Sequence, residues 1–318
     1  MAAWQSDFAP AVILTVVTLL LGTFAAIRSP FFLTALNFRG ILLLFATLAF
    51  VSLGQQVVIM TGGIDLSVGP LMGMCVIVAS FFMSEAEGPS TFALGFAVIA
   101  LLAVSVGAIN WALIDLTGLH PVIATLVTFM ALQGVALLLR PVPGGEINRD
   151  VAHALTTRIG FVPIAVIVVL VLAVLLELAL RNTAWGIRIR AAGSQPVAAE
   201  DLGVRLPLVR ATAYLASAAL AVTAGMLLIA QVGSGVAGAG IGYTLGSIAA
   251  VVLGGTSITG GRGSFVGTLV AAFLVQELIN VTVFLGLSAA LEQYLLGGII
   301  LLAVGAYSRT LQGIRATR

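Results

Sequence analysis

The acid Asp65 stands in a short glycine-rich stretch, residues 61–69, between two apolar runs of the chain. A carboxylate deep in a bilayer costs about 2.5–3.5 kcal/mol on insertion scales, so such groups usually face protein or water. Asp65 could therefore accept hydrogen bonds from the hydroxyl groups of a polar solute. Alternatively, Asp65 and the nearby Ser67 could cap the helix that follows, because both side chains accept bonds from free helix N–H groups. The sequence favours the cap.

Other polar side chains lie in or near apolar runs and could line a path for a hydroxyl-rich solute. Thr125 is one candidate. Gln276 and Asn280 form another, because a spacing of four residues puts them on one helical face. Many more such groups make interhelical hydrogen bonds, and we expect Glu177 and Asp115 to be solvated at the ends of their helices. The remaining polar residues of this kind are Gln55, Gln56, Asn110, Gln133, Glu277, Glu292 and Gln293.

The basic residues exclude one kind of chemistry. All 14 Lys and Arg positions are arginine. A phosphate-binding loop of the G-x-x-x-x-G-K-[ST] type needs its lysine, so the chain lacks a standard ATP site, and ATP-driven work would need another subunit. His120, His153 and Cys75 form no metal-ligand or nucleophile arrangement. With no basic block for nucleic acid and no convergent catalytic set, we expect neither an enzyme nor a bound metal or cofactor.

The elements that position these residues must be membrane helices. Of the 318 residues, 60% are hydrophobic and only 8% are charged, whereas soluble domains carry about 25% charged residues. We predict an all-α polytopic bundle, one domain over residues 1–318, with about ten spans of roughly 20 residues each. The predicted spans are 10–27, 40–60, 69–84, 91–115, 121–140, 161–180, 208–231, 243–258, 264–285 and 289–307.

The distribution of arginine predicts which way the spans face. An even number of spans puts both termini on one side, and cytoplasmic loops carry an excess of basic residues. With the N-terminus inside, the inner segments hold Arg181, Arg188, Arg190, Arg205, Arg210, Arg262, Arg309, Arg315 and Arg318, and the outer segments hold Arg28, Arg39, Arg140, Arg149 and Arg158. This bias predicts that both termini are cytoplasmic.

Two of the predicted spans, 69–84 and 243–258, are short and adjoin glycine-rich stretches. Short, glycine-interrupted segments in both halves of a chain indicate broken helices that line a transport site. Close packing between helices also selects small residues, and the sequence leaves both explanations open. The glycines concerned are Gly62, Gly63, Gly69, Gly254, Gly255, Gly260, Gly261 and Gly263.

Three sequence blocks resemble a known family. Residues 62–69 read GGIDLSVG, residues 120–126 read HPVIATL, and residues 248–264 contain IAAVVLGGTS followed by GGRGS. In this order they resemble the ribose/xylose/arabinose-type ABC transporter permeases, the branched binding-protein-dependent inner-membrane components. The resemblance covers roughly residues 40–305.

The segment from Arg181 to Pro207 is the longest inner loop, and its residues predict a short helix at about 195–203. Pro196 suits a first helical turn, and Gly203 suits the left-handed residue after a helix end. The loop is similar to the coupling helix of these permeases, with Gln195, Ala198, Ala199, Gly203 and Val204 on matching positions, although Gln195 replaces the usual Asn and Pro196 is atypical. A plain surface loop is the alternative.

The resemblance implies a bacterial inner-membrane permease subunit of an ABC importer for a small sugar, which the sequence does not specify. It further implies three partners: a cytoplasmic ATPase subunit that binds the ATP, a second permease subunit, alike or different, and a periplasmic sugar-binding protein that meets the outer loops, chiefly residues 141–160. The competing hypothesis is a proton-coupled secondary transporter with Asp65, Glu277 and Glu292 as relay groups.

Overall fold

The computed structural model describes residues 2–288, 290–291, 293–295, 297–298 and 301. In this part of the chain, seven helices are long and apolar enough to cross a membrane, and two apolar helices are shorter. The long helices are α1 (Ala2–Arg28), α2 (Ala35–Met60), α4 (Pro89–Asp115), α5 (Pro121–Leu139), α7 (Ile164–Asn182), α10 (Leu206–Val232) and α12 (Phe265–Phe284). The shorter ones are α3 (Val68–Phe82) and α11 (Ile241–Leu253). The predicted helical membrane bundle is therefore confirmed.

The nine apolar helices fall on the first nine predicted spans, and the third and eighth are short, as their glycine-rich flanks predicted. The last predicted span, 289–307, lies largely outside the described residues. Glu292, Arg309, Arg315 and Arg318 lie outside them as well. The count of about ten spans therefore stays a prediction.

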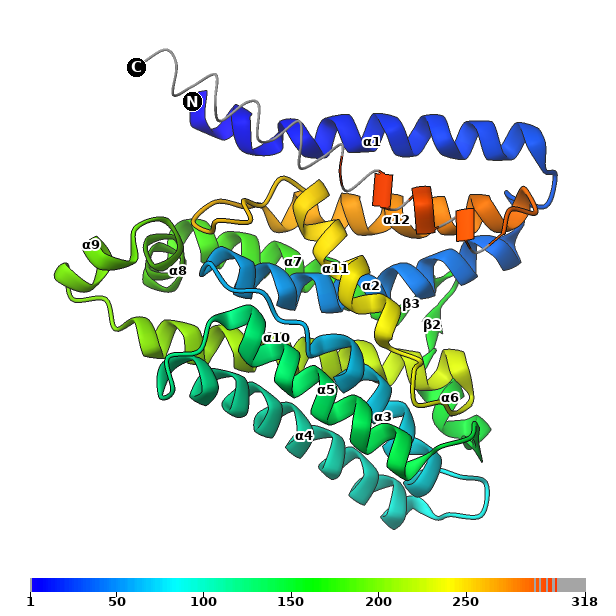
Figure 1. Ribbon diagram of the computed structural model, residues 1–318. Coiled ribbons are helices and arrows are strands. Elements are labelled where there is room, and N and C mark those ends of the chain that lie inside the picture. Colours follow the sequence, from blue (N-terminus) through cyan, green and yellow to red (C-terminus); the bar gives the residue numbers. More distant parts are fainter. Residues whose placement is uncertain (1, 289, 292, 296, 299–300, 302–318) are drawn as a thin grey trace.

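Helix α2 forms the buried centre of the bundle. Each of its residues from Phe45 to Met60 is buried, and it packs against α10, α12 and α11. Helix α10 also contacts α3 and α4, whereas α1 lies along α12 at the edge of the molecule (Figure 1). A helix that is apolar on every side belongs in the core, and the buried part of α2 also carries the polar side chains of Gln55 and Gln56.

Short elements close the two ends of the bundle. Helices α8 (Ala184–Ser194) and α9 (Pro196–Asp201) project at one end, and α6 (Arg149–Leu155) lies at the other (Figure 1). Two small antiparallel sheets accompany α6: β1 (Gly144–Glu146) pairs with β4 (Ser234–Gly235), and β2 (Arg158–Ile159) pairs with β3 (Val162–Pro163). These elements distinguish the two ends of the bundle.

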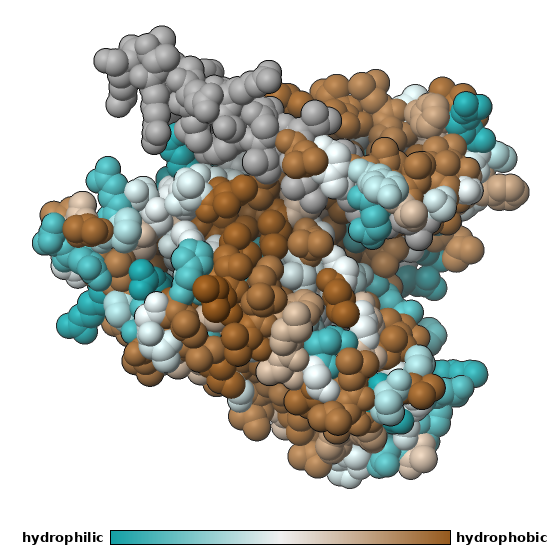
Figure 2. All heavy atoms as spheres, viewed as in Figure 1, coloured by the Kyte–Doolittle hydropathy of each residue, from teal (hydrophilic) through white to brown (hydrophobic). Residues whose placement is uncertain are grey.

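The surface has the pattern expected of a protein in a bilayer. Figure 2 shows hydrophobic residues across the middle of the visible face and hydrophilic residues gathered toward its ends. Large apolar side chains on the spans are well exposed, including Leu101 at 64%, Met130 at 61% and Leu138 at 84%. Exposed apolar area on this scale marks an interaction surface, and its place on the apolar helices fits contact with the acyl chains of lipids.

Candidate functional site at the two helix breaks

The first helix break, residues 61–67 between α2 and α3, is held by the carboxylate of Asp65. This side chain is completely buried. Its Oδ1 atom accepts hydrogen bonds from the backbone N–H and the hydroxyl of Ser67, at 3.0 and 2.6 Å. Its Oδ2 atom accepts from the Ser217 hydroxyl of α10 at 2.8 Å, and Asn110 of α4 donates to Ser67 Oγ at 2.8 Å. The break is thereby tied to two spans.

The backbone of the same break is also fixed. The Gln55 side chain lies 2.9 Å from the carbonyl oxygen of Asp65 and 3.2 Å from its amide nitrogen, and one orientation of the amide satisfies both groups. The hydroxyl of Thr125 in α5 donates to the carbonyl of Ile64 at 3.0 Å. The structure therefore brings Asp65, Ser67 and Thr125 together, with protein groups as their partners.

The prediction of a helix cap here is wrong for Ser67. Ser67 occupies the N-cap position of α3, but its side chain makes no capping hydrogen bond. The Ser67 hydroxyl donates to Asp65 and accepts from Asn110 instead. Asp65 accepts one backbone N–H just before the helix, and its second oxygen reaches across to α10. Interhelical bonds replace the cap because a buried carboxylate needs several donors at once.

Helices α3 and α11 cross where their backbones touch. A Cβ atom on Gly69 would lie 2.7 Å from the carbonyl oxygen of Gly240 and would overlap the hydroxyl of Thr244. A Cβ atom on Gly240 would in turn lie 2.8 Å from the amide nitrogen of Gly73. The close-packing explanation for the glycines thus applies here, because the short helices meet without intervening side chains. That these helices line a transport site stays a prediction.

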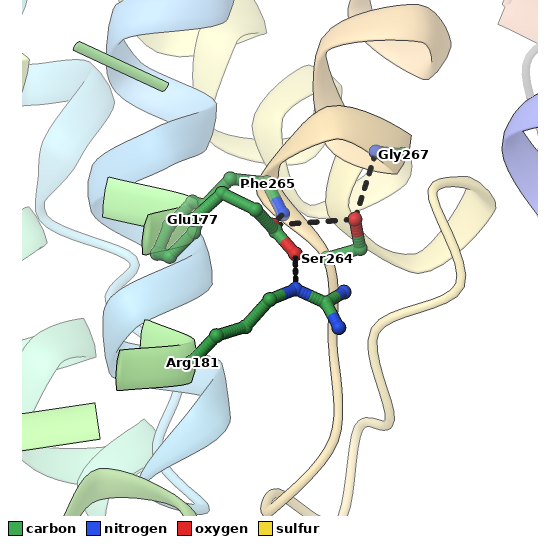
Figure 3. Close-up of polar contacts among 5 residues, drawn as sticks. All are labelled: Glu177, Arg181, Ser264, Phe265 and Gly267. Carbon is green, nitrogen blue, oxygen red and sulfur yellow. Dashed lines mark hydrogen bonds and ion pairs between the residues drawn. The ribbon is translucent and has the colours of Figure 1, made fainter. Parts of the chain in front are cut away.

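The second break, residues 254–264, ends at α12, and the carboxylate of Glu177 holds its end (Figure 3). Glu177 Oε2 accepts from the backbone N–H of Phe265 at 2.7 Å and from the hydroxyl of Ser264 at 3.3 Å. Its Oε1 atom pairs with Arg181 Nε at 2.5 Å. Ser264 itself caps α12 by accepting from Gly267 N at 3.4 Å. The last turn of α7 is thereby attached to the first turn of α12.

The expectation that Glu177 and Asp115 are solvated is wrong. Glu177 is only 7% exposed, and the Asp115 side chain, 4% exposed, pairs with Arg210 of α10 at 2.6 Å. A carboxylate is stabilised by the positive N-terminal end of a helix and by an arginine. The spacing of Glu177 and Arg181, four residues apart, was the sequence signal for the first ion pair.

The two breaks meet each other and α8 at one backbone junction. The amide of Gly261 donates to the carbonyl of Met60 at 2.9 Å. A Cβ atom on Gly193 in α8 would lie 2.6 Å from the amide nitrogen of Gly261 and would overlap the Met60 carbonyl. A Cβ atom on Gly260 would lie 2.9 Å from the amide nitrogen of Gly62. The sequence singled out the other glycines but not Gly193, which lies in α8, outside the glycine-rich stretches.

The short helix predicted at 195–203 is present as α9, and its ends follow the predicted chemistry. Pro196 occupies the first turn. Gly203 has a φ of +84°, and its amide donates to the Glu200 carbonyl at 2.8 Å. Ala199 is buried at 3% exposure, whereas Val197 is 73% exposed. One face of α9 is therefore anchored to its own chain, and the other is open to a partner.

Gln276 and Asn280 lie away from the first break. The amides of Asn280 and Asn37 exchange hydrogen bonds of 2.8 and 3.2 Å, which join α12 to α2. Gln276 is buried at 6% exposure. Glu277 is also buried, and a Cβ atom on Gly22 of α1 would lie 2.6 Å from its Oε1. Among the residues that the structure describes, Glu277 Oε2 has no hydrogen-bond partner.

Comparison with known proteins identifies the family of the chain. The family model described as "Branched-chain amino acid transport system / permease component" matches residues 37–304. The chain belongs to this family. It is 33% identical to the ribose import permease protein RbsC of Bacillus subtilis, over 88% of this chain and 87% of the relative. It is also 33% identical to the probable ABC transporter permease protein YphD of Escherichia coli, over 92% and 87%.

A third relative is the autoinducer 2 import system permease protein LsrC of Yersinia enterocolitica, 31% identical over 81% of this chain and 71% of the relative. No solved structure matches the chain. The resemblance to ABC transporter permeases that the sequence blocks predicted is confirmed. The chain is thus a multi-pass inner-membrane transport component and not an enzyme.

Proposed function

We propose that this chain is the membrane-spanning permease subunit of an ABC importer that takes up a small sugar. The observation that carries the proposal is the 33–34% identity to ribose import permeases over nearly nine-tenths of both chains. The family description names branched-chain amino acids, but the relatives named by substrate are ribose and autoinducer 2 permeases. A hydroxyl-rich solute therefore fits better than an amino acid.

The energy for transport comes from a separate cytoplasmic ATPase subunit. The absence of lysine supports this proposal, because the chain lacks the residue of a standard ATP site. Helix α9 would be the coupling helix, since Val197 within it and Leu202 directly after it are 73% and 86% exposed. A short helix of this kind can dock into a groove of a partner. In this arrangement both termini are cytoplasmic and the chain crosses the membrane about ten times.

The backbone junction at Gly193 would carry movement of α9 into the membrane. Helix α8 directly precedes α9 and touches both helix breaks through Gly193. Glu177 and Arg181 attach the chain just before α8 to the first turn of α12. A displacement of α8 and α9 would therefore move the ends of α2 and α12 together. Rocking of packed units in this way is a common basis of alternating access.

The opposite end of the molecule would receive a periplasmic sugar-binding protein. There, Glu85 accepts hydrogen bonds from the Asn148 side chain at 3.2 Å and from the Arg149 amide at 3.0 Å. Asn148 in turn caps α6 by accepting from the Asp150 amide at 2.8 Å. These bonds attach α6 to the loop after α3. We propose this ordered segment, residues 141–160, as the main docking platform.

The path of the sugar would run past a second permease subunit, alike or different, that pairs with this one. The sequence offered five candidates for lining this path: Asp65, Ser67, Thr125, Gln276 and Asn280. The geometry supports an anchoring role for Asp65, whose oxygens are already occupied by Ser67 and Ser217. We therefore propose that Asp65 acts on the path through the position of α3 and not by contact with sugar.

A proton-coupled transporter is the second candidate, and Glu277 is the observation in its favour. This carboxyl group lies in a span, and one of its oxygens has no partner in the part of the chain that the structure describes. Ionisable groups inside membranes often serve proton relays. Such a transporter would need no second protein, which distinguishes it from the first proposal.

The experiment that tests the function is reconstitution into vesicles. The permease is co-expressed with its candidate ATPase and binding protein, purified in mild detergent and assayed for uptake of radiolabelled pentoses and hexoses. We expect uptake to require ATP and the binding protein and to survive a protonophore. Uptake by the permease alone, abolished by the protonophore, would establish the second candidate instead.

A further inference from the structure

A pocket of about 490 Å³ opens between α8, the loop after α9 and the start of α10. It is separate from both helix breaks. Its lining combines two arginines, a tryptophan and apolar side chains of a membrane span. The lining residues are Trp185, Arg188, Gly203, Arg205, Leu208, Val209 and Thr212.

Among the residues that the structure describes, no acid forms an ion pair with the two arginines of this pocket. The side chains of Arg188 and Arg205 form no ion pair or hydrogen bond with any residue for which the structure gives a position. The nearby acids of α9, Glu200 and Asp201, form no ion pair with either of them. By contrast, Arg210, one turn further along α10, is paired with Asp115. Two unpaired guanidinium groups that line one pocket favour an anionic ligand.

The surroundings indicate what kind of anion it is. Trp185 is half-buried in the lining, and tryptophan is enriched where a membrane protein meets the water interface. The lining continues onto the exposed side of α10, where Leu208 is 55% exposed and Leu215, two turns further into the span, is 37% exposed. A ligand that fills this site has a charged head for the arginines and an apolar tail for α10.

We propose that this pocket binds the phosphate group of an anionic phospholipid, with an acyl chain along Leu208 and Leu215. Basic pockets at the cytoplasmic ends of spans are suited to such headgroups. Gly203, one of the predicted coupling residues, is part of the lining. Docking of the ATPase is nevertheless less well supported at this spot, because the exposed Val197 of α9 and Leu202 directly after it are not part of the lining. The inference rests on the proposed function only for assigning the pocket to the cytoplasmic leaflet.

Lipid retention by the purified protein tests the proposal. Native mass spectrometry compares retained phosphatidylglycerol with phosphatidylcholine for the wild type and for a variant with both Arg188→Gln and Arg205→Gln. We expect the wild type to prefer phosphatidylglycerol and the double variant to lose about twenty-fivefold in that preference, since each arginine near an anionic surface contributes about fivefold. Arg149→Gln, an exposed arginine at the opposite end, should leave it unchanged.

Two further measurements separate the alternatives. The variant with Arg188→Lys and Arg205→Lys should retain most of the preference, and thermal unfolding should show that all variants are folded. Equal retention of phosphatidylglycerol by the glutamine variant would overturn the proposal, as would full displacement of the lipid by glycerol phosphate, which would assign the pocket to soluble phosphates. A glutamine variant that keeps the lipid but no longer co-purifies with the ATPase would assign the arginines to that partner.

The result is independent of transport because retention needs neither sugar nor ATP. A permease that retains phosphatidylglycerol but transports no sugar would contradict the proposed function alone. One that transports sugar but shows no lipid preference would contradict the lipid site alone.

Discussion

The amide of Gly261 donates a hydrogen bond to the carbonyl of Met60 over 2.9 Å and thereby joins the two helix breaks of the chain. Gly193 of α8 lies against this bond so closely that a methyl group could not be added without a shift. The projecting helices and the interior of the bundle are thus in direct backbone contact.

Substitution of Gly193 tests this junction. Gly193→Val should lower the free energy of unfolding by about 1–3 kcal/mol, the usual cost of overpacking a filled site. The new side chain would displace the Met60 carbonyl or the Gly261 amide, so uptake should fall as well. Thermal unfolding in detergent and sugar uptake in vesicles measure the two effects.

The matched control for that substitution is Gly134→Ala in α5, where a Cβ atom would meet nothing within 4 Å. This change should be neutral or raise stability by up to about 1 kcal/mol, as alanine favours a helix over glycine. If Gly193→Val behaves like the control, the junction is not tightly packed.

Replacement of Glu177 should separate ATP hydrolysis from transport. Glu177→Gln keeps a group that can accept from Phe265 N but removes the charge that pairs with Arg181. Loss of a charge-assisted hydrogen bond corresponds to about 1.5–3 kcal/mol. We expect the complex to assemble and hydrolyse ATP while uptake falls about tenfold, which corresponds to 1.4 kcal/mol.

The control for this prediction is Glu87→Gln, an exposed glutamate with no side-chain hydrogen bond in the described structure. It should leave both activities unchanged. Equal losses of hydrolysis and uptake in Glu177→Gln would indicate general destabilisation and would contradict a specific role in coupling.

Asp65→Ala distinguishes an anchor from a sugar ligand. The change removes the acceptor for the Ser67 and Ser217 hydroxyls, and each bond to a charged group contributes about 1.5–3 kcal/mol. We expect a clear loss of thermal stability, with a smaller loss in Ser217→Ala. Normal stability combined with a raised KM for uptake would instead establish Asp65 as a sugar ligand.

The two alanines of α9 should respond differently to arginine. Ala198 is exposed and Ala199 is only 3% exposed. Ala198→Arg should leave the spans folded and reduce co-purification of the ATPase at least about tenfold, the effect of a lost central contact at an interface. Ala199→Arg should lower the unfolding temperature, because it places a charge in a buried site. Retention of the ATPase by the Ala198 variant would show that α9 is not the coupling helix.

The sequence predicted the parts of this molecule that depend on local chemistry. The apolar runs placed the seven long apolar helices and the two shorter ones of the described residues, and the glycine-rich flanks indicated that α3 and α11 are short. Pro196 and Gly203 defined the ends of α9 because each residue has a restricted or unusual backbone preference. The family was identified from its sequence blocks.

The sequence could not predict contacts between segments that are distant along the chain, because these depend on how the helices pack. Ser217 is the partner of Asp65 across more than a hundred residues of chain, and a single serine in an apolar run gives no sign of this. The burial of Glu177 follows from the position of the α12 N-terminus beside α7, which the order of spans leaves open. The role of Gly193 likewise depends on a contact between three distant segments.

The absence of side chains between Gly193, Gly261 and Met60 has a consequence for signalling across the membrane. Because the backbones touch directly, a displacement of either segment is passed on to the other. Coupling between two binding sites is reciprocal by thermodynamic necessity. If binding of the ATPase to α9 changes the affinity of the path for solute, then binding of solute must change the affinity of α9 for the ATPase by the same factor.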